Sequence, residues 1–393
     1  MEDESSGCFG VLEYNTAKIV HIKSKKIGIL YRLVQLIIVG YVIGYAIVYK
    51  KGYQIFDQVQ SSVTSKVKGV AFTNFSQSDP SIGTRIWDTA DYVVPAEEND
   101  ATFVITNMII TPNQTNGICS ETHKNHDAHC TKDMDCPKGI PIKDGHGVRT
   151  GKCDLSTKTC KIYAWCPIET DQLKYPFPIL EDAKDFTLLI KNSIQFPKFQ
   201  YRKRNIANVS SDFLKSCRYS PNNAMSKLCP IFTIDSIVNA TGESFNPIAY
   251  LGGVIAILIR WDCDLDFGDS KCLPEYTFQR LDNPNVTLSP GYNFRFPIYY
   301  QIDNTQHRTL TKAYGIRFIF IVFGQAGKFN IVPLLLNLGS GLALLSIATV
   351  LCDIIVLYFI RGRMYYYGHK YEVIEEADEE SESFIQPVEN KRL

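Results

Sequence analysis

Closely spaced basic side chains are the residues of this sequence best suited to bind a charged ligand. Lys66 and Lys68 stand two residues apart, and such residues of a β-strand point to the same face. Their ammonium groups repel each other unless water solvates them or an anion matches them, and a solvated face is the commoner case. Asn293, Arg295 and Lys312 form a second polar group. If the two groups converge, they would hold a polyphosphate, because arginine binds phosphate bidentately and lysine binds it as a point charge.

Three histidines, His123, His126 and His129, fall within seven residues. Imidazoles at this density could hold zinc or sense protons. Their spacing fits no strict structural zinc class, and the neighbouring Cys119 and Cys130 suit disulfides better than metal. We therefore weigh a modulatory zinc, magnesium or proton site against an ordinary polar loop.

Signatures of soluble enzymes are missing. Residues 147–153 lack the spacing and the hydroxyl residue of a phosphate-binding loop, and no His-Glu-x-x-His is present. Residues 266–270 loosely resemble an acidic, glycine-containing phosphate turn, but a polar turn between Cys263 and Cys272 explains them better. The 41 basic and 41 acidic residues give a net charge of zero, which argues against a nucleic-acid partner.

Two apolar runs must anchor these groups to a lipid bilayer. Residues 33–49 and 331–360 approach or exceed the ~20 apolar residues of a membrane-spanning helix. Backbone at that depth must bond internally, so both runs are expected to be helical. The second run also carries Asn337, Ser340, Thr349 and Asp353. A helix that lines an aqueous path needs such groups, whereas a lipid-facing anchor does not.

One face of the second helix is the expected pore lining. At about 3.6 residues per turn, Leu336, Ser340 and Ala343 fall on one side of the helix, and Asn337 lies beside them. Asp353 falls about 100° off that face in a straight helix. It therefore either binds a neighbouring helix or lines only the cytoplasmic mouth.

Charges, cysteines and glycosylation sequons predict the topology. Basic residues precede the first run and follow the second at Arg361 and Arg363, which places residues 1–32 and 361–393 in the cytoplasm. Ten of the 12 cysteines lie between Cys119 and Cys272. The same middle segment holds five sequons, at Asn74, Asn113, Asn208, Asn239 and Asn285. Both signals mark an oxidising, extracellular compartment, so residues 50–330 are expected outside the plasma membrane.

The extracellular segment is predicted to be mainly β. Short β-like runs separated by turn residues cover 92–94, 102–106, 186–190, 254–259 and 316–323. Six cysteines within residues 119–166 accompany few large apolar side chains, so crosslinks must hold that region. Cys217 with Cys229 and Cys263 with Cys272 are local pairs, and a disulfide in each pair would close a short loop. The expected fold class is a membrane protein with two transmembrane helices and a large, disulfide-rich β ectodomain.

Six motifs together resemble the ATP-gated P2X receptor channels, most nearly the vertebrate subtype-four members of that family. The motifs are Tyr14-x-Thr16-x-Lys18, residues 62–69, residues 85–88, residues 291–296, residues 312–318 and residues 324–329. The resemblance covers residues 14–371, nearly the whole chain. The ten ectodomain cysteines match the family in order.

The resemblance implies a homotrimeric, non-selective channel for sodium, potassium and calcium, opened by extracellular ATP. ATP would be an agonist, with no cofactor and no enzymatic activity. One subunit would hold the phosphates with Lys66 and Lys68, and its neighbour would add Asn293, Arg295 and Lys312. Base and ribose would lie against Thr187, Leu189, Lys191, Leu214 and Ile231. The gate region of the family matches Leu336 and Asn337.

The resemblance also implies a disulfide pattern that the sequence alone leaves open among many connectivities. The implied pairs are Cys119–Cys166, Cys130–Cys153, Cys136–Cys160, Cys217–Cys229 and Cys263–Cys272. The chain departs from the family in residues 120–150, whose histidine triplet is not part of the family pattern. It also departs at Thr311, where an apolar residue is usual, and at Ile319, where an acidic residue is common.

Two other functions fit parts of the sequence. A membrane ecto-nucleotidase can share two spans and a cysteine-rich ectodomain, but it needs acidic metal ligands and a nucleophilic water, and no such constellation is found. A proton- or peptide-gated two-span channel fits the topology equally well, but the basic set argues against it. Glu97, Glu98 and Asp100 are a candidate cation reservoir, and a solvated acidic loop explains them as well.

Overall fold

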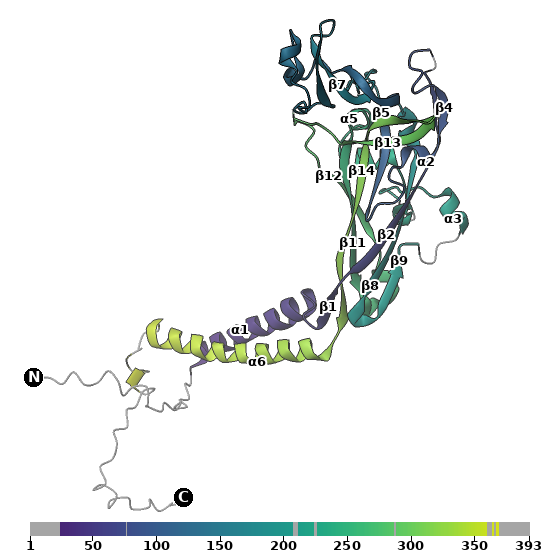
Figure 1. Ribbon diagram of the computed structural model, residues 1–393. Coiled ribbons are helices and arrows are strands. Elements are labelled where there is room, and N and C mark those ends of the chain that lie inside the picture. Colours follow the sequence, from purple (N-terminus) through teal and green to yellow (C-terminus); the bar gives the residue numbers. More distant parts are fainter. Residues whose placement is uncertain are drawn as a thin grey trace, which may run out of the picture. The chain divides into compact units, whose positions relative to one another are not determined.

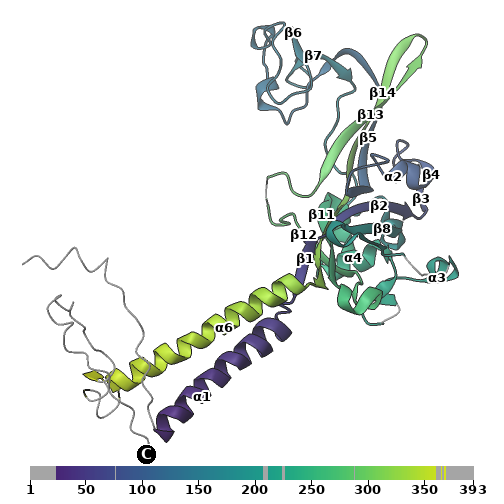
Figure 2. The same cartoon turned by 90° about the horizontal axis from the view of Figure 1, so that it is seen from below.

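The computed structural model describes residues 24–75, 77–206, 211–223, 226–286, 288–359, 364 and 367–368. The chain divides into two compact units (Figures 1 and 2). One gathers the described residues up to Ile55 and from Phe329 onward, and the other is Phe56–Lys328. Each unit has its own architecture, one helical and one mainly β.

Two long apolar helices make the first unit. Helix α1, Lys25–Gly40, continues as the π-helical η1, Tyr41–Tyr49, and α6, Ile331–Ile354, continues as η8, Ile355–Phe359. Both combined helices are long and apolar enough to cross a bilayer. The first begins before the apolar run that starts at residue 33. Asn330 caps α6, since its Oδ1 accepts a hydrogen bond from Val332 N at 2.8 Å.

The two helices pack closely where one of them carries a small residue. A Cβ atom on Gly341 would lie 2.7 Å from Val42 Cγ1, so only glycine allows this approach. Val42, Gly341, Ala348 and Cys352 are buried in the seam. Most other side chains of both helices are exposed in the single chain, so their outer faces are available to lipid or to other subunits.

An eight-stranded sheet forms the frame of the second unit. Its strands follow the order β12-β11-β14-β5-β7-β6, and β1 and β13 also pair with β14. Strand β14 pairs in parallel with β11 and antiparallel with β13 and β5. The bounds are β1 Gln54–Gln58, β5 Ala101–Ser120, β6 Val148–Asp154, β7 Thr159–Cys166, β11 Gly253–Asp264, β12 Glu275–Arg280, β13 Asn293–Ile302 and β14 Thr305–Phe329.

A four-stranded sheet packs its apolar face into the same core. Strands β10, β8 and β2 lie in that order, and β9 pairs with β8. Along β8, every second side chain from Leu188 to Phe196 is buried, which is the alternation of a half-buried strand. The bounds are β2 Gln60–Lys68, β8 Thr187–Phe196, β9 Tyr201–Arg204 and β10 Ile231–Thr233, with a separate hairpin of β3 Ala71–Asn74 and β4 Thr84–Trp87.

Short helices connect the strands. The α-helices are α2 Thr89–Tyr92, α3 Ser211–Ser216, α4 Ile234–Ala240 and α5 Phe245–Leu251. The 3-10 turns are η2 His126–Ala128, η3 Asp133–Asp135, η4 Glu181–Asp185, η5 Pro197–Phe199, η6 Ser226–Leu228 and η7 Leu265–Lys271. The last of these is the polar turn expected for residues 266–270.

The strand predicted at residues 92–94 was wrong. A capping box on Asp88 and Asp91 starts α2 instead, because the Asp88 carboxylate accepts the hydrogen bond of an otherwise unpaired helix N–H. Only Val93 keeps a strand contact, an isolated bridge to Val104. The other four predicted runs lie within β5, β8, β11 and β14, apart from Phe186, which directly precedes β8.

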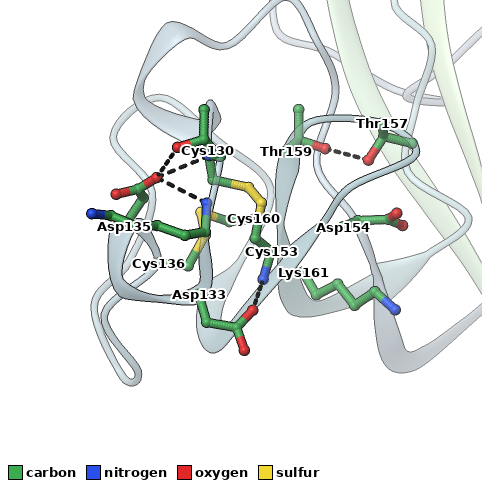
Figure 3. The surroundings of a disulfide bond; sticks show 12 residues. Cys130, Asp133, Asp135, Cys136, Cys153, Asp154, Thr157, Thr159, Cys160 and Lys161 are labelled. Carbon is green, nitrogen blue, oxygen red and sulfur yellow. Dashed lines mark hydrogen bonds between the residues drawn. A yellow bond between two sulfur atoms is a disulfide. The ribbon is translucent and has the colours of Figure 1, made fainter.

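Residues 119–166 have little core and many crosslinks. Their buried cluster consists of seven residues, Ala128, Cys130, Cys136, Ile142, Cys160, Ile162 and Ala164, three of which are cysteines. Figure 3 shows two of the disulfides side by side, Cys130–Cys153 and Cys136–Cys160, with Asp133 and Asp135 bonded to nearby backbone. The small apolar cluster explains why disulfides must stabilise this region.

The five disulfides join the pairs that the resemblance implies. They are Cys119–Cys166, Cys130–Cys153, Cys136–Cys160, Cys217–Cys229 and Cys263–Cys272. Cys352 is a free, buried thiol in α6, and Cys8 lies outside the described residues.

Candidate functional site

The outer face of the β10-β8-β2 sheet collects most of the predicted base and phosphate ligands. Lys68 is the register partner of Thr187, and Lys66 is the partner of Leu189, which in turn pairs with Ile231. Directly opposed residues of neighbouring strands share a face, so these five side chains form two rows across the sheet. The core-facing neighbours Val67 and Leu188 are buried and fix which side points outward.

Lys191 and Leu214 extend this group to different degrees. Lys191 opposes Thr64 one row further along the same face. Leu214 lies on α3, in the segment that leads to the Cys217–Cys229 disulfide, and it is half-buried. The structure therefore brings Lys191 together with the sheet residues, while Leu214 stands on a separate loop.

An open groove of about 840 Å³ runs along β2. Lys66 and Lys68 line it together with Val93 and residues 95–102. Glu98 on the other wall is bonded to the guanidinium of Arg317, so it is not a free carboxylate for cations. The candidate cation reservoir therefore loses one of its three charges to an internal ion pair.

The second predicted group, Asn293, Arg295 and Lys312, also lies together in the fold. Arg295 on β13 is the register partner of Lys312 on β14, and Asn293 pairs with Tyr314 one row away. Lys312 is buried, and its ammonium lies 5.2 Å from the centre of the Tyr314 ring. Two cations and an amide thus share one face at the β13-β14 pair.

Two carboxylates neutralise these cations. Arg295 Nε donates to Glu169 Oε2 at 2.7 Å, and its Nη2 lies 3.6 Å from Asp171 Oδ1. Lys312 Nζ donates to the same Asp171 carboxylate. The side chain of Glu169 is 4% exposed, whereas that of Arg295 is 44% exposed.

Proton affinities reflect these contacts. Burial alone lowers the pKa of Arg295, but the hydrogen bond and charge of Glu169 raise it above its ordinary value. The pKa of Lys312 is raised in the same way, because Asp171 outweighs the effect of burial. Burial works to raise the pKa of Asp171, and the hydrogen bond and charge of Lys312 lower it overall. All three groups are therefore held in their charged forms.

Sequence reasoning missed Glu169 and Asp171. The available signal was their spacing, two residues apart and shortly after Cys166. No local pattern links them to Arg295, which lies 126 residues after Glu169 in the chain. Only the fold, which brings this segment to the β13-β14 pair, reveals the contact.

The predicted pore residues lie on two sides of α6. Leu336, Ser340 and Ala343 are exposed in the single chain. Asn337 instead turns toward the segment that follows the first helix, where its Nδ2 donates to Gly52 O at 2.7 Å; it also donates to Pro333 O of its own helix at 3.0 Å. The structure therefore separates Asn337 from the exposed face that was expected to include it.

Asp353 is half-buried near the end of α6. It directly follows Cys352, which is buried in the seam with the first helix. Consecutive residues of a helix point about 100° apart, so Asp353 lies between the seam side of α6 and the face of Leu336.

The three histidines do not converge on a common point. His129 Nε2 is hydrogen-bonded to the carbonyl of His123 at 2.9 Å, and the rings of His126 and His129 meet edge to face at 5.4 Å. Among the described residues, the one group of three possible ligand atoms within 4.8 Å is Cys130, Cys136 and Cys153. All three are in disulfides and offer no thiolate. The geometry therefore gives no support to a zinc or magnesium site at the histidine triplet.

Four of the five sequons lie on exposed asparagines, namely Asn74, Asn113, Asn239 and Asn285. Asn113 adopts a left-handed backbone conformation with φ 54°, and its Oδ1 accepts a hydrogen bond from Tyr300. Asn239 donates to Asp235 within α4. Asn208 lies outside the described residues.

Comparisons with known proteins agree with this geometry. A family model described as ATP P2X receptor matches residues 12–373. The chain is 50% identical to mouse P2X purinoceptor 4 over 387 residues, which cover 95% of this chain and 98% of that protein. It is 46% identical to human P2X purinoceptor 5 over 383 residues, covering 95% of this chain and 84% of that protein.

Two solved structures share the fold. An invertebrate P2X receptor from the Gulf Coast tick, in the presence of ATP and Zn²⁺, has a TM-score of 0.75 and 44% identity, covering 83% of this chain and 99% of that one. The chicken ATP-gated P2X7 receptor channel, with the competitive antagonist TNP-ATP, has a TM-score of 0.75 and 37% identity, covering 84% and 100%.

The matches span nearly the whole chain and include the two membrane helices, the β-rich ectodomain and its disulfides. They confirm the fold class and the expectation that the protein is no enzyme. Receptors of this kind bind extracellular ATP and form trimeric channels in the plasma membrane. This chain is an ATP-gated cation channel, and it belongs to the P2X receptor family.

Proposed function

We propose that three copies of this chain form a homotrimer in which each ATP lies between two subunits. One subunit supplies the β10-β8-β2 face, with Lys66 and Lys68 on the phosphates and Thr187, Leu189, Lys191, Leu214 and Ile231 around the base and ribose. Its neighbour supplies Asn293, Arg295 and Lys312. The channel passes sodium, potassium and calcium without strong selection.

The observation that carries this proposal is a difference in charge balance between the two groups. Lys66 and Lys68 stand exposed on one face without an ion-pair partner in the described parts of the chain. Arg295 and Lys312 are already paired with Glu169 and Asp171. A polyphosphate would satisfy the first group and replace the carboxylates of the second.

Binding opens the channel only if ATP prefers the open conformation. We propose that the phosphates draw the two groups together across the subunit boundary. Strand β14 carries Lys312 and leads to α6 through Asn330 alone. Movement of β14 can therefore reach the pore helix without a flexible linker.

The exposed face of α6, with Leu336, Ser340 and Ala343, is the proposed pore lining. Asn337 would contribute to the gate only after leaving its hydrogen bond to Gly52, and Asp353 is assigned to a helix contact or to the cytoplasmic mouth. We place residues 1–32 and 361–393 in the cytoplasm, the spans at 33–49 and 331–360, and residues 50–330 outside the cell.

A complementation experiment tests the arrangement. Lys68→Ala and Arg295→Ala subunits are expressed alone and together, and ATP-evoked currents are recorded by patch clamp at matched surface expression. Each variant alone should lose the response to ATP at concentrations that saturate the wild type. Together they should recover current, because an Arg295→Ala subunit still offers Lys68 to a Lys68→Ala neighbour that still offers Arg295.

Two controls make the result specific. Co-expression of Lys66→Ala with Lys68→Ala should give no recovery, because both defects lie on the same side of the site. If Lys68→Ala and Arg295→Ala also fail to complement each other, the two groups act within one subunit and the proposal is wrong. An unmutated chain that reaches the surface but passes no ATP-evoked current would refute the assignment of the site as a whole.

A further inference from the structure

The outward face of the four-stranded sheet stays cationic beyond the residues assigned to ATP. Arg202 and Arg204 on β9 are exposed, and they are the register partners of Gln195 and Ser193 on β8. Ser193 and Gln195 continue the alternation that places Leu189 and Lys191 on the outer face. Both arginines therefore lie on the same face as Lys191.

We call the five cations of this face, Lys66, Lys68, Lys191, Arg202 and Arg204, the cationic track. None of them has a carboxylate within ion-pair distance in the described part of the chain. The other outward residues of β2 are the neutral hydrogen-bonding groups Thr64, Ser62 and Gln60, and β8 adds Thr187, Ser193, Gln195 and the apolar Leu189. Five positive charges on one face of a chain whose net charge is zero form a local surplus that an anionic partner would balance.

The inward side of β9 is different, which shows that the exposed arginines are not simply a feature of a basic segment. Lys203 points the other way and donates to the carbonyl of Asp269 at 2.6 Å. Tyr201 on that side donates to the Asp269 carboxylate at 2.6 Å. The inward pair anchors β9 to the η7 turn, and the outward pair is left for solvent or ligand.

The length of the track exceeds that of a nucleotide triphosphate group. Successive rows are two residues apart, or about 6.8 Å, and four such steps separate the Lys68 row from the Arg202 row, about 27 Å in all. ATP, as proposed for this channel, occupies the rows from Lys68 to Lys191, so a ligand that uses the whole track would compete with it. A ligand that uses the whole track must be long, flexible enough to follow a twisted sheet, and charged along its length.

We propose that the cationic track binds a linear sulfated polysaccharide. Arginine holds sulfate as it holds phosphate, with two parallel N–H···O bonds, and the intervening serine, threonine and glutamine side chains can bond sugar hydroxyls. Single-stranded nucleic acid is disfavoured, because its binding sites stack bases on aromatic side chains and the outward positions of these strands carry none.

The full-length chain, purified in detergent, is titrated with fluorescent heparin fragments of graded length. The dissociation constant should fall with length until the fragment spans about 27 Å and then level off. Arg202→Gln together with Arg204→Gln should weaken binding of the longest fragment by roughly two- to thirtyfold, the range for two exposed ion pairs. The control, Lys132→Gln with Arg260→Gln, removes two charges outside the track and should leave binding unchanged.

Three results would overturn the inference. The first is equal weakening in the track variant and the control, which would mean only general charge attraction. The second is saturation by inorganic sulfate at the same sulfate concentration, which would mean isolated anion sites. The third is binding to phosphatidylserine vesicles with no binding to the fragments, which would assign the track to a lipid surface. ATP-evoked currents of the track variant should match those of the wild type, because neither arginine is assigned to the ATP site. Matching currents would also show that the variant is expressed and assembled.

Discussion

Glu169 holds Arg295 in an ion pair. In the proposed site ATP must break this pair, so neutralising the carboxylate should raise the apparent affinity for ATP. The variant Glu169→Gln keeps the shape of the side chain. Its amide oxygen can still accept the hydrogen bond from Arg295 Nε, now 2.7 Å from Glu169 Oε2. Glu169 Oε1 has no hydrogen-bond partner among the described residues, so the new amide nitrogen replaces no existing bond.

The expected size of the effect follows from the exposure of the pair. Unit charges about 4 Å apart attract each other by about 4 kcal/mol at an effective dielectric constant near 20. Glu169 is buried, but Arg295 is 44% exposed, so solvent screening reduces the net value to about 1 kcal/mol. This energy corresponds to about a fivefold lower ATP concentration for half-maximal current.

Whole-cell recordings of ATP concentration-response curves give the measurement, with surface biotinylation to match expression. Glu275→Gln is the control, because Glu275 Oε2 also lies 2.7 Å from an arginine nitrogen, that of Arg260, on strands outside the site. A half-maximal concentration that stays unchanged or rises in Glu169→Gln would refute the view that this carboxylate competes with ATP. An equal shift in Glu275→Gln would trace the effect to overall charge.

Two further predictions concern the helix seam and the disulfide-rich region. Gly341→Ala should lower the thermal stability of the purified channel, because the new Cβ would lie 2.7 Å from the stiff side chain of Val42. The control Gly339→Ala has open space around its new Cβ, so the thermal stability should stay unchanged or rise. Equal shifts in the two variants would contradict the packing argument. The hydrogen bond from Glu121 raises the pKa of His146 above 6.5. Burial acts to raise the pKa of Glu121, but the hydrogen bonds from His146 outweigh it and lower that pKa below 4.5. The histidine contribution is complete below pH 6.5 and is lost as pH rises through its raised value, and the glutamate contribution is lost as pH falls below 4.5. The hydrogen-exchange protection factors of residues 119–166, which correct for the intrinsic pH dependence of exchange, should therefore be highest between about pH 4.5 and 6.5. His146→Asn should remove the fall in protection above pH 6.5, and a variant that keeps this fall would contradict the assignment.

Sequence patterns predicted the parts of the fold that depend on local periodicity. The apolar runs predicted the two membrane helices because their hydrophobicity needs no tertiary context. The apolar, β-branched run at residues 186–190 predicted the strand β8, and the Lys66–Lys68 spacing predicted a shared face. Residues 92–94 failed because two aspartates formed a capping box that outweighed the β-branched valines.

The site was predicted in one respect and missed in another. The family motifs pointed to Arg295 and Lys312, but no residues near them in the sequence indicated that Glu169 and Asp171 would be their partners. Contacts across more than a hundred residues depend on which strands become neighbours, and spacing rules do not reach that far. The same limit applies to Asn337, whose orientation toward Gly52 depends on how the two helices pack.

The disulfide Cys119–Cys166 has a consequence for the redox chemistry of the channel. Glu169 follows Cys166 by three residues, so this crosslink ties the segment that carries both carboxylates to β5. Besides the disulfide, the register pairing of Thr115 with Cys166 and the bond from Gln114 Nε2 to Pro167 O hold this segment on β5. A reductant at the cell surface would leave the segment that carries the carboxylates with these hydrogen bonds alone, so the thiol–disulfide state of Cys119 and Cys166 bears on the position of the carboxylates that pair with Arg295.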